Sequence, residues 1–374
     1  MADTNDSPRR LTAGGPHYYP LRAGSDIGGE VYERMLLEHL PGHGIDLVLG
    51  LPRDHRVTEP PRGWRIDVLR HRRGLHWVGA PLAFTPYVVR LLRSRQVDLL
   101  RAESVRYCGP ALLAGRALAR SRVPIVIHQH HLYPRWAQLE AAIMRRADAV
   151  ITVSAFSQRR LVMAGVPAER IHVVPEGVAR PAPTGGWTDA WPQPGLRLLH
   201  VGRLEPRKRP WVAIDALAVL QRSGVAASLV VAGEGSLREE LRGRAGVLGV
   251  SEAVWFAGRV PEPDKWRLYD SADVLLFASA LEGFGLVVAE AQSRGVPVVA
   301  AIGTATAEAL DPGRSGLLTT PDGEAFAAQV RALSDGPRRL EMGARAVRHA
   351  ERFDWDACAA GVARVYRELV DRRR

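Results

Sequence analysis

Two stretches in the second half of the sequence decide the fold: Leu198-Leu-His-Val-Gly-Arg-Leu-Glu-Pro-Arg-Lys208 and, after the apolar run Val274–Phe277, Glu282-Gly-Phe-Gly-Leu-Val-Val-Ala-Glu290. In both, a short apolar run that predicts a buried strand leads through a glycine-containing loop into a segment of helical period. Strand, loop and helix in this order are the building unit of a parallel, doubly wound sheet.

The same alternation runs through the whole chain and predicts an α/β fold. Buried strands are expected at residues 46–49, 97–100, 124–128, 149–153, 172–174, 196–201, 228–232, 254–257, 274–277 and 296–300. Helices are expected at residues 31–40, 139–146, 154–164, 211–222, 237–248, 286–294 and 355–374. These are too many strands for one small sheet.

Residues 180–195, which include P-A-P-T-G-G and W-P-Q-P-G, are rich in Pro and Gly and predict a linker. We therefore expect two Rossmann-like domains that face a central cleft, at residues 1–180 and 181–353. An amphipathic C-terminal helix at residues 354–374 is expected to pack back toward the first domain. Ligands of such sheets lie at the carboxyl ends of the strands.

The composition is that of a folded protein: of 374 residues, 46% are apolar and 24% are charged, which excludes global disorder. The two cysteines, Cys108 and Cys358, cannot form a disulfide framework or a zinc cage. No apolar run approaches the ~18–20 residues of a membrane helix, and the N-terminus lacks the apolar core of a signal peptide. A cytoplasmic protein is expected, with peripheral contact at the inner membrane face left open.

The net charge of +11 is unevenly distributed. Residues 1–180 hold 26 Arg and Lys against 16 Asp and Glu, a net charge of +10, whereas residues 181–374 hold 25 against 24. All of these basic residues are arginines except Lys208 and Lys265. A basic half indicates an anionic partner such as phosphate or an acidic lipid surface. Nucleic acid is not expected, because zinc-finger spacing, an aromatic RNA-binding signature and a basic helix with heptads are all absent.

Two strand ends in the second half offer glycines or cations to a ligand. Arg203 and Lys208 follow Gly202 before the next helix, where a diphosphate would meet cations and a helix N-terminus together. A solvated basic loop is the alternative. Gly233 and Gly235, in V-V-A-G-E-G, either approach a ligand or pack backbone against backbone.

The segment from Glu282 to Glu290 has the character of a ligand loop. Gly283 and Gly285 let the chain pass close to a ligand, and a helix beginning near Leu286 leaves backbone N–H groups free at its start. Glu290 lies about one turn into this helix. Its carboxylate can accept two hydroxyl hydrogen bonds, as recognition of a ribose diol requires.

In this order, the motifs G-R-L-E-P-R-K, V-V-A-G-E-G, F-A-G-R-V-P and E-G-F-G-L-V-V-A-E-A closely resemble the GT-B glycosyltransferases of family GT4. The stretches 147–154 and 173–178 resemble that family's domain junction. The resemblance covers residues 123–318 well and the first 120 residues in outline. It implies a hexosyltransferase-type enzyme that moves a sugar from a nucleoside diphosphate sugar, of UDP or GDP type, to an acceptor hydroxyl with retention.

The resemblance also implies a role for each matching residue. Glu282 would contact the transferred sugar and Glu290 the ribose hydroxyls, while Arg203 and Lys208 would neutralise the diphosphate in place of a metal ion. We therefore expect neither a metal nor a resident cofactor. Further donor contacts are implied for Gly28, Gly29, Gly202, Gly233, Gly235, Arg259, Val260, Gly283, Phe284, Gly285 and Leu286.

Three histidines follow the strand at 124–128, namely His128, His130 and His131. A metal patch is one interpretation, although no Asp or Glu ligand follows nearby. The resemblance instead implies that His130 lies beside the sugar, near its anomeric carbon. The sequence departs from the family at His131, where many members have Asp, at Thr304, where the family has a glycine, and near residues 9–13, where the first strand is short and polar.

The acceptor is expected to bind the basic N-terminal domain. Candidate contacts in its loops or strand ends are Tyr18, Tyr19, Arg101, Glu103, Tyr107 and Tyr133. Residues 84–95 carry apolar side chains against three arginines, which predicts either a helix that covers the sheet or one that lies on an anionic membrane. The acceptor is accordingly a small metabolite or natural product, or a lipid-linked or polysaccharide sugar.

Other functions of the same fold are alternatives. They are a non-catalytic partner protein that binds sugar nucleotides, a sugar-nucleotide epimerase and a phosphorylase. A dinucleotide-binding oxidoreductase ranks last, because no G-x-G-x-x-G follows a first strand.

Overall fold

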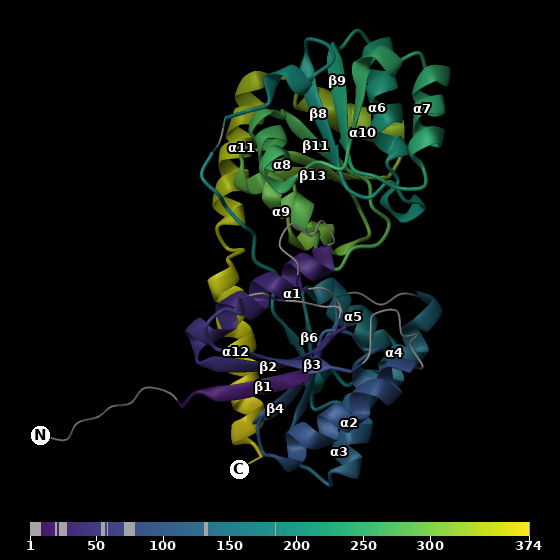
Figure 1. Ribbon diagram of the computed structural model, residues 1–374. Helices are drawn as coiled ribbons and strands as arrows, with labels where there is room; N and C mark the ends of the chain where they lie inside the picture. The colour runs from purple at the N-terminus through teal and green to yellow at the C-terminus, as the bar shows by residue number, and fades with distance from the viewer. Residues whose placement is uncertain are drawn as a thin grey trace, which may run out of the picture. The chain divides into compact units, whose positions relative to one another are not determined.

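The computed structural model describes residues 9–18, 21, 28–53, 57, 59–70, 79–130, 134–183 and 185–373 (Figure 1). The chain divides into two compact units. Unit 1 holds Met1–Gly177 together with Trp355–Arg374, and unit 2 holds Val178–Asp354. Each unit contains one parallel sheet with helices packed on it, which confirms the predicted class of two Rossmann-like domains.

The described residues of unit 1 form a seven-stranded parallel sheet in the order β3-β2-β1-β4-β5-β6-β7. The strands are β1 (Leu11–Pro16), β2 (Ile45–Pro52), β3 (Trp64–Leu69), β4 (Leu99–Ala102), β5 (Ile125–His128), β6 (Ala149–Thr152) and β7 (Ile171–Val173). The strand order reverses between β1 and β4, and ligands of doubly wound sheets bind at the carboxyl ends beside such a reversal.

Helices cover this sheet. They are α1 (Gly28–His39), α2 (Gly79–Arg93), α3 (Gly109–Leu118), α4 (Ala137–Met144), α5 (Ala155–Met163) and α12 (Trp355–Asp371). Side chains of α2 to α5 share one buried core with the sheet, and α12 packs along α1. The helix at residues 84–95 is part of α2 and buries Phe84, Val88 and Leu91 completely. Its apolar face therefore covers the sheet, and the alternative that this face lies on a membrane is wrong.

Unit 2 repeats the architecture with six strands in the order β10-β9-β8-β11-β12-β13, all parallel. The strands are β8 (Leu196–Val201), β9 (Ala227–Ala232), β10 (Val254–Gly258), β11 (Val274–Phe277), β12 (Val298–Ala301) and β13 (Gly316–Thr319). The helices are α6 (Trp211–Arg222), α7 (Arg238–Val247), α8 (Glu262–Ser271), α9 (Leu286–Ser293), α10 (Gly323–Ala332) and α11 (Gly336–Ala350).

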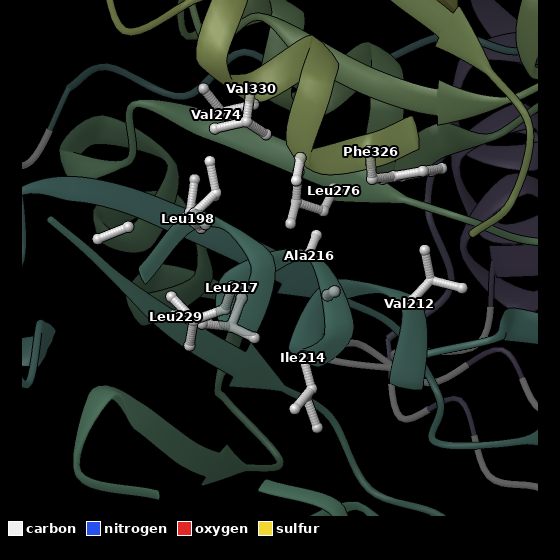
Figure 2. Close-up of a cluster of buried hydrophobic side chains, with 14 of the residues drawn as sticks. Leu198, Val212, Ile214, Ala216, Leu217, Leu229, Val274, Leu276, Phe326 and Val330 are labelled. Atoms are coloured by element: carbon white, nitrogen blue, oxygen red, sulfur yellow. The ribbon is translucent and has the colours of Figure 1, made fainter. Parts of the chain in front are cut away.

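One face of this second sheet carries a large apolar core. Figure 2 shows side chains of β8, β9 and β11, such as Leu198, Leu229 and Leu276, gathered with those of α6 and α10. α6 is apolar on most sides, which suits a helix that packs against both the sheet and α10. The fixed sheet positions the loops that leave its carboxyl ends, where the candidate site lies.

The first strand differs most from expectation. The expected short polar strand near residues 9–13 is instead β1, which is six residues long and lies inside its sheet between β2 and β4. Its apolar pattern is interrupted by Gly14 and Gly15. A Cβ at Gly15 would lie only 2.3 Å from the Arg101 carbonyl oxygen, so the close approach of β4 requires a glycine there. Strands β3 and β13 were not anticipated either.

The Pro- and Gly-rich stretch at residues 180–195 belongs to unit 2 and is partly packed against it. It contains a short 3-10 helix, η4 (Thr188–Ala190). The backbone N–H of Trp187 donates to the Arg267 carbonyl (3.1 Å), and the Trp187 ring meets Trp255 edge to face. This part of the predicted linker is therefore packed against unit 2.

Candidate active site

The loop between β8 and α6 brings Lys208 to Glu282. Lys208 ends the 3-10 helix η5 (Pro206–Lys208), and two residues separate it from the start of α6. Its Nζ lies 2.5 Å from Glu282 Oε1, and each side chain is 13% exposed. The backbone N–H of Ala280 also donates to the Arg207 carbonyl (2.7 Å). The loops that follow the neighbouring strands β8 and β11 are thereby joined.

Arg203 lies on the same loop but has a different partner. Its guanidinium is 2.5 Å from Glu205 Oε1, and its side chain is 55% exposed. Arg207 approaches the other oxygen of Glu205 at 3.4 Å. The structure therefore gives the two predicted cations separate carboxylates, with Arg203 the more accessible of the two.

Gly233 and Gly235 serve backbone packing. Gly233 has φ +150° and Gly235 φ +159°. A Cβ on Gly233 would meet the Gly202 carbonyl oxygen, and one on Gly235 would lie 2.3 Å from the Leu204 carbonyl oxygen. Backbone hydrogen bonds continue the pairing beyond the strands, from Gly202 N–H to Ala232 O and from Leu204 N–H to Glu234 O. The structure shows this close packing, which fixes the loop that carries Arg203.

The start of α9 is formed by the glycine loop. Gly285 is the N-cap residue with φ +105°, a conformation that disfavours any side chain. Gly283 precedes it, and Phe284 is buried against Phe353, with ring centroids 5.0 Å apart. The helix begins at Leu286, as predicted. The Val288 N–H donates to the Gly285 carbonyl (2.9 Å), and the start of the helix forms a positive end next to Glu282 in sequence.

Glu290, in α9, is held by two side chains of α8. Lys265 Nζ donates to Glu290 Oε1 (2.8 Å), and the Tyr269 hydroxyl donates to Oε2 (2.9 Å). Burial, together with the Glu290 carboxylate, raises the pKa of Tyr269 well above its ordinary value, so the phenol stays a donor. Sequence motifs did not single out Lys265 or Tyr269. The signal that was present is that Lys265 is one of only two lysines in the chain.

Arg259 and Val260 follow the carboxyl end of β10, the edge strand that pairs with β9. The Gly233 N–H donates to the Gly258 carbonyl (2.7 Å), which joins this end to the β9 turn. Arg259 is exposed and Val260 half-buried. Thr304, where a glycine was expected, caps a 3-10 helix, η7 (Ala305–Glu308), through its hydroxyl. Its departure from the family pattern thus has a local structural role.

In unit 1, His130 follows β5 and is held at three points. Its Nδ1 lies 3.1 Å from Glu176 Oε1, its ring meets Tyr32 edge to face at 4.2 Å, and its carbonyl accepts from the Ser157 hydroxyl (3.0 Å). The side chain of His130 is 18% exposed and that of Glu176 8% exposed. Glu176 and Tyr32 were missed from the sequence because both are distant from His130 along the chain.

Some of the residues predicted for the site in unit 1 lie outside the described residues, and others lie in a different element from the one expected. Gly28 and Gly29 are the first two residues of α1 and not a loop before it. Tyr19, Tyr133 and His131 lie outside the described residues. Tyr18 and Tyr107, by contrast, are brought together, with their rings stacked 3.8 Å apart.

Arg101 and Glu103 require a correction, because neither side chain is presented at a surface. Arg101 is 2% exposed, lies 2.5 Å from Glu33 Oε1 and donates to the Tyr366 hydroxyl (3.3 Å). Glu103 accepts from the Tyr18 backbone N–H (2.6 Å) and is likewise buried. The sequence suggested strand-end residues open to an acceptor, but buried ion pairing has turned both side chains inward.

His128 belongs to the same buried cluster. Its Nε2 lies 2.8 Å from the Tyr366 hydroxyl, and burial lowers the pKa of His128 well below its ordinary value. No group of three or more His, Cys, Asp or Glu suited to a metal lies in the described part of the chain. Across those same residues, no helix is both long and apolar enough to cross a membrane.

Two family models match the chain. "Glycosyltransferase Family 4" matches residues 27–180 and "Glycosyl transferases group 1" matches residues 189–352. A D-inositol 3-phosphate glycosyltransferase of Acidothermus cellulolyticus is 31% identical, over 98% of this chain and 92% of its own. One of Thermobispora bispora is 35% identical, over 91% and 79%. A glycogen synthase of Mycobacterium tuberculosis is 32% identical, over 61% and 56%.

Solved structures show the same fold. The Anabaena protein Alr3699/HepE, crystallised with UDP and glucose, has a TM-score of 0.74 at 21% identity, over 96% of this chain and all of its own. A sucrose-phosphate synthase from Thermosynechococcus elongatus has a TM-score of 0.77 at 21% identity, over 97% and 100%. From the relatives that match over most of their length and from both family models, we conclude that this chain belongs to glycosyltransferase family 4, with the GT-B fold.

Proposed function

We propose that this glycosyltransferase moves a sugar from a nucleoside diphosphate sugar to an acceptor hydroxyl, with retention and without a metal ion. The observation that carries the proposal is the contact between Lys208 and Glu282 across two neighbouring strand ends, next to the start of α9. A cation and a helix N-terminus suit phosphate, and a carboxylate suits sugar hydroxyls. These are the two parts of the donor on either side of the bond that breaks.

The chemistry needs no protein nucleophile. As the bond between the anomeric carbon and the phosphate oxygen breaks, negative charge grows on the diphosphate, so fixed positive groups there lower the barrier most. Lys208, Arg203 and the first-turn amides of α9 supply them. The departing phosphate oxygen takes the proton of the acceptor hydroxyl as that oxygen bonds to the anomeric carbon on the same face. His130, to which the family resemblance assigns a contact with the sugar, is held by Glu176 within unit 1.

We propose UDP as the nucleotide and a small anionic polyol as the acceptor. The first is supported by the structural neighbour crystallised with UDP and glucose, and the second by the full-length relatives named D-inositol 3-phosphate glycosyltransferase. The net charge of +10 on residues 1–180 suits an anionic acceptor. A lipid-linked acceptor is less favoured, because the apolar face of α2 is buried.

The test measures nucleoside diphosphate release from UDP- and GDP-sugars with and without inositol phosphates, in EDTA and in Mg²⁺. Release that needs both donor and acceptor and is equal in EDTA and Mg²⁺ is expected, with the donor's anomeric configuration kept in the product by NMR. Inversion would refute retention, and loss of activity in EDTA would refute metal independence. Donor conversion without an acceptor would favour an epimerase, and a requirement for free phosphate a phosphorylase.

A further inference from the structure

The two lysines of this chain have the same kind of partner. Among 51 basic residues, only Lys208 and Lys265 are lysines. Lys208 contacts Glu282, which directly precedes the glycine loop. Lys265 contacts Glu290, which lies eight residues later in α9. Both contacts are to Oε1 alone. Each lysine of the chain is therefore paired with one of these two carboxylates.

Arginine makes a different contact in the same unit. Arg197 binds Asp273 through Nε and a terminal nitrogen, at 3.0 and 3.2 Å to its two oxygens. Arg244 binds both oxygens of Asp215 in the same way. Such a fork occupies both oxygens at once, whereas an ammonium group is a point charge that needs only one. A lysine therefore neutralises a carboxylate while leaving it open to another ligand.

Glu290 has this open arrangement. An ionised carboxylate has about four lone-pair directions, two on each oxygen. Lys265 takes one on Oε1 and Tyr269 takes one on Oε2. These are its side-chain hydrogen bonds within the described part of the chain, so one direction on each oxygen is left there, which is what two neighbouring hydroxyls of a ribose require. The carboxylate is also 10% exposed, so without Lys265 its charge would be largely buried and unpaired.

We propose that Lys265 is a specificity-determining positioning residue, whose single-point contact orients Glu290 to bind the 2′- and 3′-hydroxyls of the donor's ribose. This inference rests on the proposed function. The proposal predicts that a positive charge at position 265 is not sufficient for recognition of the ribose. An arginine at this position would keep the charge but would fork onto both oxygens and displace the ribose hydroxyls.

The experiment compares binding of UDP, GDP and ADP with that of dUDP, dGDP and dADP by calorimetry, without metal. For the nucleotide that binds the wild-type chain, we expect at least roughly tenfold preference for ribose over 2′-deoxyribose, the size of a hydrogen bond to a charged group. In Lys265→Met and in Lys265→Arg, the ribose preference should fall below about threefold. The matched control is Arg267→Met, on the same helix, with Arg267 paired to Asp264 and not to Glu290.

The results test three statements separately: the single-point contact, the role of Lys265 toward the ribose, and the proposed function itself. If Lys265→Arg keeps the wild-type ribose preference, the single-point contact is refuted, and if Lys265→Met also keeps it, any role of Lys265 toward the ribose is refuted. Should Lys265→Met fail to fold, Lys265→Arg still gives the answer, because it retains the charge beside Glu290. If the wild-type chain binds no nucleoside diphosphate, the proposed function fails before Lys265 is tested.

Discussion

Replacing Gly233 with Ala is expected to impair catalysis by displacing a loop, without removing any group that touches a substrate. An added Cβ would lie 1.9 Å from the Gly202 carbonyl oxygen, whereas real Cβ contacts begin near 3.0 Å. One of the two strand-end loops must therefore move by at least 1.1 Å, the difference between these distances. The loop at Gly202 carries Arg203 and Lys208. Because a displacement of about 1 Å in a positioning element costs about 10²-fold in rate, we expect that loss in kcat/KM.

The comparison with Gly202→Ala isolates this displacement. Gly202 has φ +154°, close to the +150° of Gly233, so Ala costs a similar backbone strain of ~1–3 kcal/mol at either position. At Gly202, however, the nearest atom to the new Cβ is 3.9 Å away. Gly243→Ala, in α7 with nothing within 4 Å, is the neutral control.

The assay is steady-state release of nucleoside diphosphate, with a thermal melt of each variant to confirm folding. Gly233→Ala should lose far more activity than Gly202→Ala, while Gly243→Ala matches the wild type. A folded Gly233→Ala variant within threefold of wild-type kcat/KM would refute the argument that this contact positions the loop.

Three further predictions concern charged groups. Lys208→Met and Glu282→Gln should each lower kcat by about 10²–10³-fold, and the double variant should lose little more than the worse single one, because the two form one ion pair; fully additive losses would contradict this. Glu33→Gln should lower the free energy of unfolding by about 3–5 kcal/mol in urea titration, since it leaves the buried Arg101 guanidinium without its counter-charge; an unchanged urea midpoint would speak against the pair. Burial raises the pKa of Glu140 from 4.5 to about 7, so the folded state holds a proton there that the unfolded state has lost, and stability falls as pH rises through that window. The melting temperature of Glu140→Gln should therefore rise relative to that of the wild type between pH 5 and pH 8. A constant difference between the two melting temperatures would show that Glu140 does not titrate in this range.

Much of the fold follows from local pattern. β11 is an uninterrupted apolar run, and β8 is apolar apart from Arg197 and His200, so the bounds of both strands were predicted to the residue. β1 was expected as a shorter, polar strand near residues 9–13, because Gly14 and Gly15, which the tight packing of neighbouring strands requires, carry no apolar side chain to extend it. β3 alternates with Arg65 and Asp67 at a sheet edge and lacks a continuous apolar signal.

The site was predictable only where its residues are adjacent in sequence. The glycine loop and its two glutamates form a local motif, and their chemistry could be inferred from it. The partners of the site residues come from other elements: Lys265 contacts Glu290, and Glu176 contacts His130. The sheet of each unit brings these partners together, so a local motif does not reveal them. Arg101 was misassigned for the same reason, since its partner Glu33 lies 68 positions earlier on another element.

The hydroxyl of Tyr366 has a consequence for the order in which the chain completes its structure. It meets both Arg101 and His128 inside unit 1, yet it is synthesised after the whole of unit 2. On the ribosome, unit 2 is therefore available to fold as a continuous segment, whereas the earlier unit must wait with Arg101 and His128 lacking their contact with Tyr366. α12 completes that unit only after unit 2 has been synthesised. A chain that stops at Asp354 should leave the ribosome with unit 2 intact and unit 1 open to chaperones and proteases.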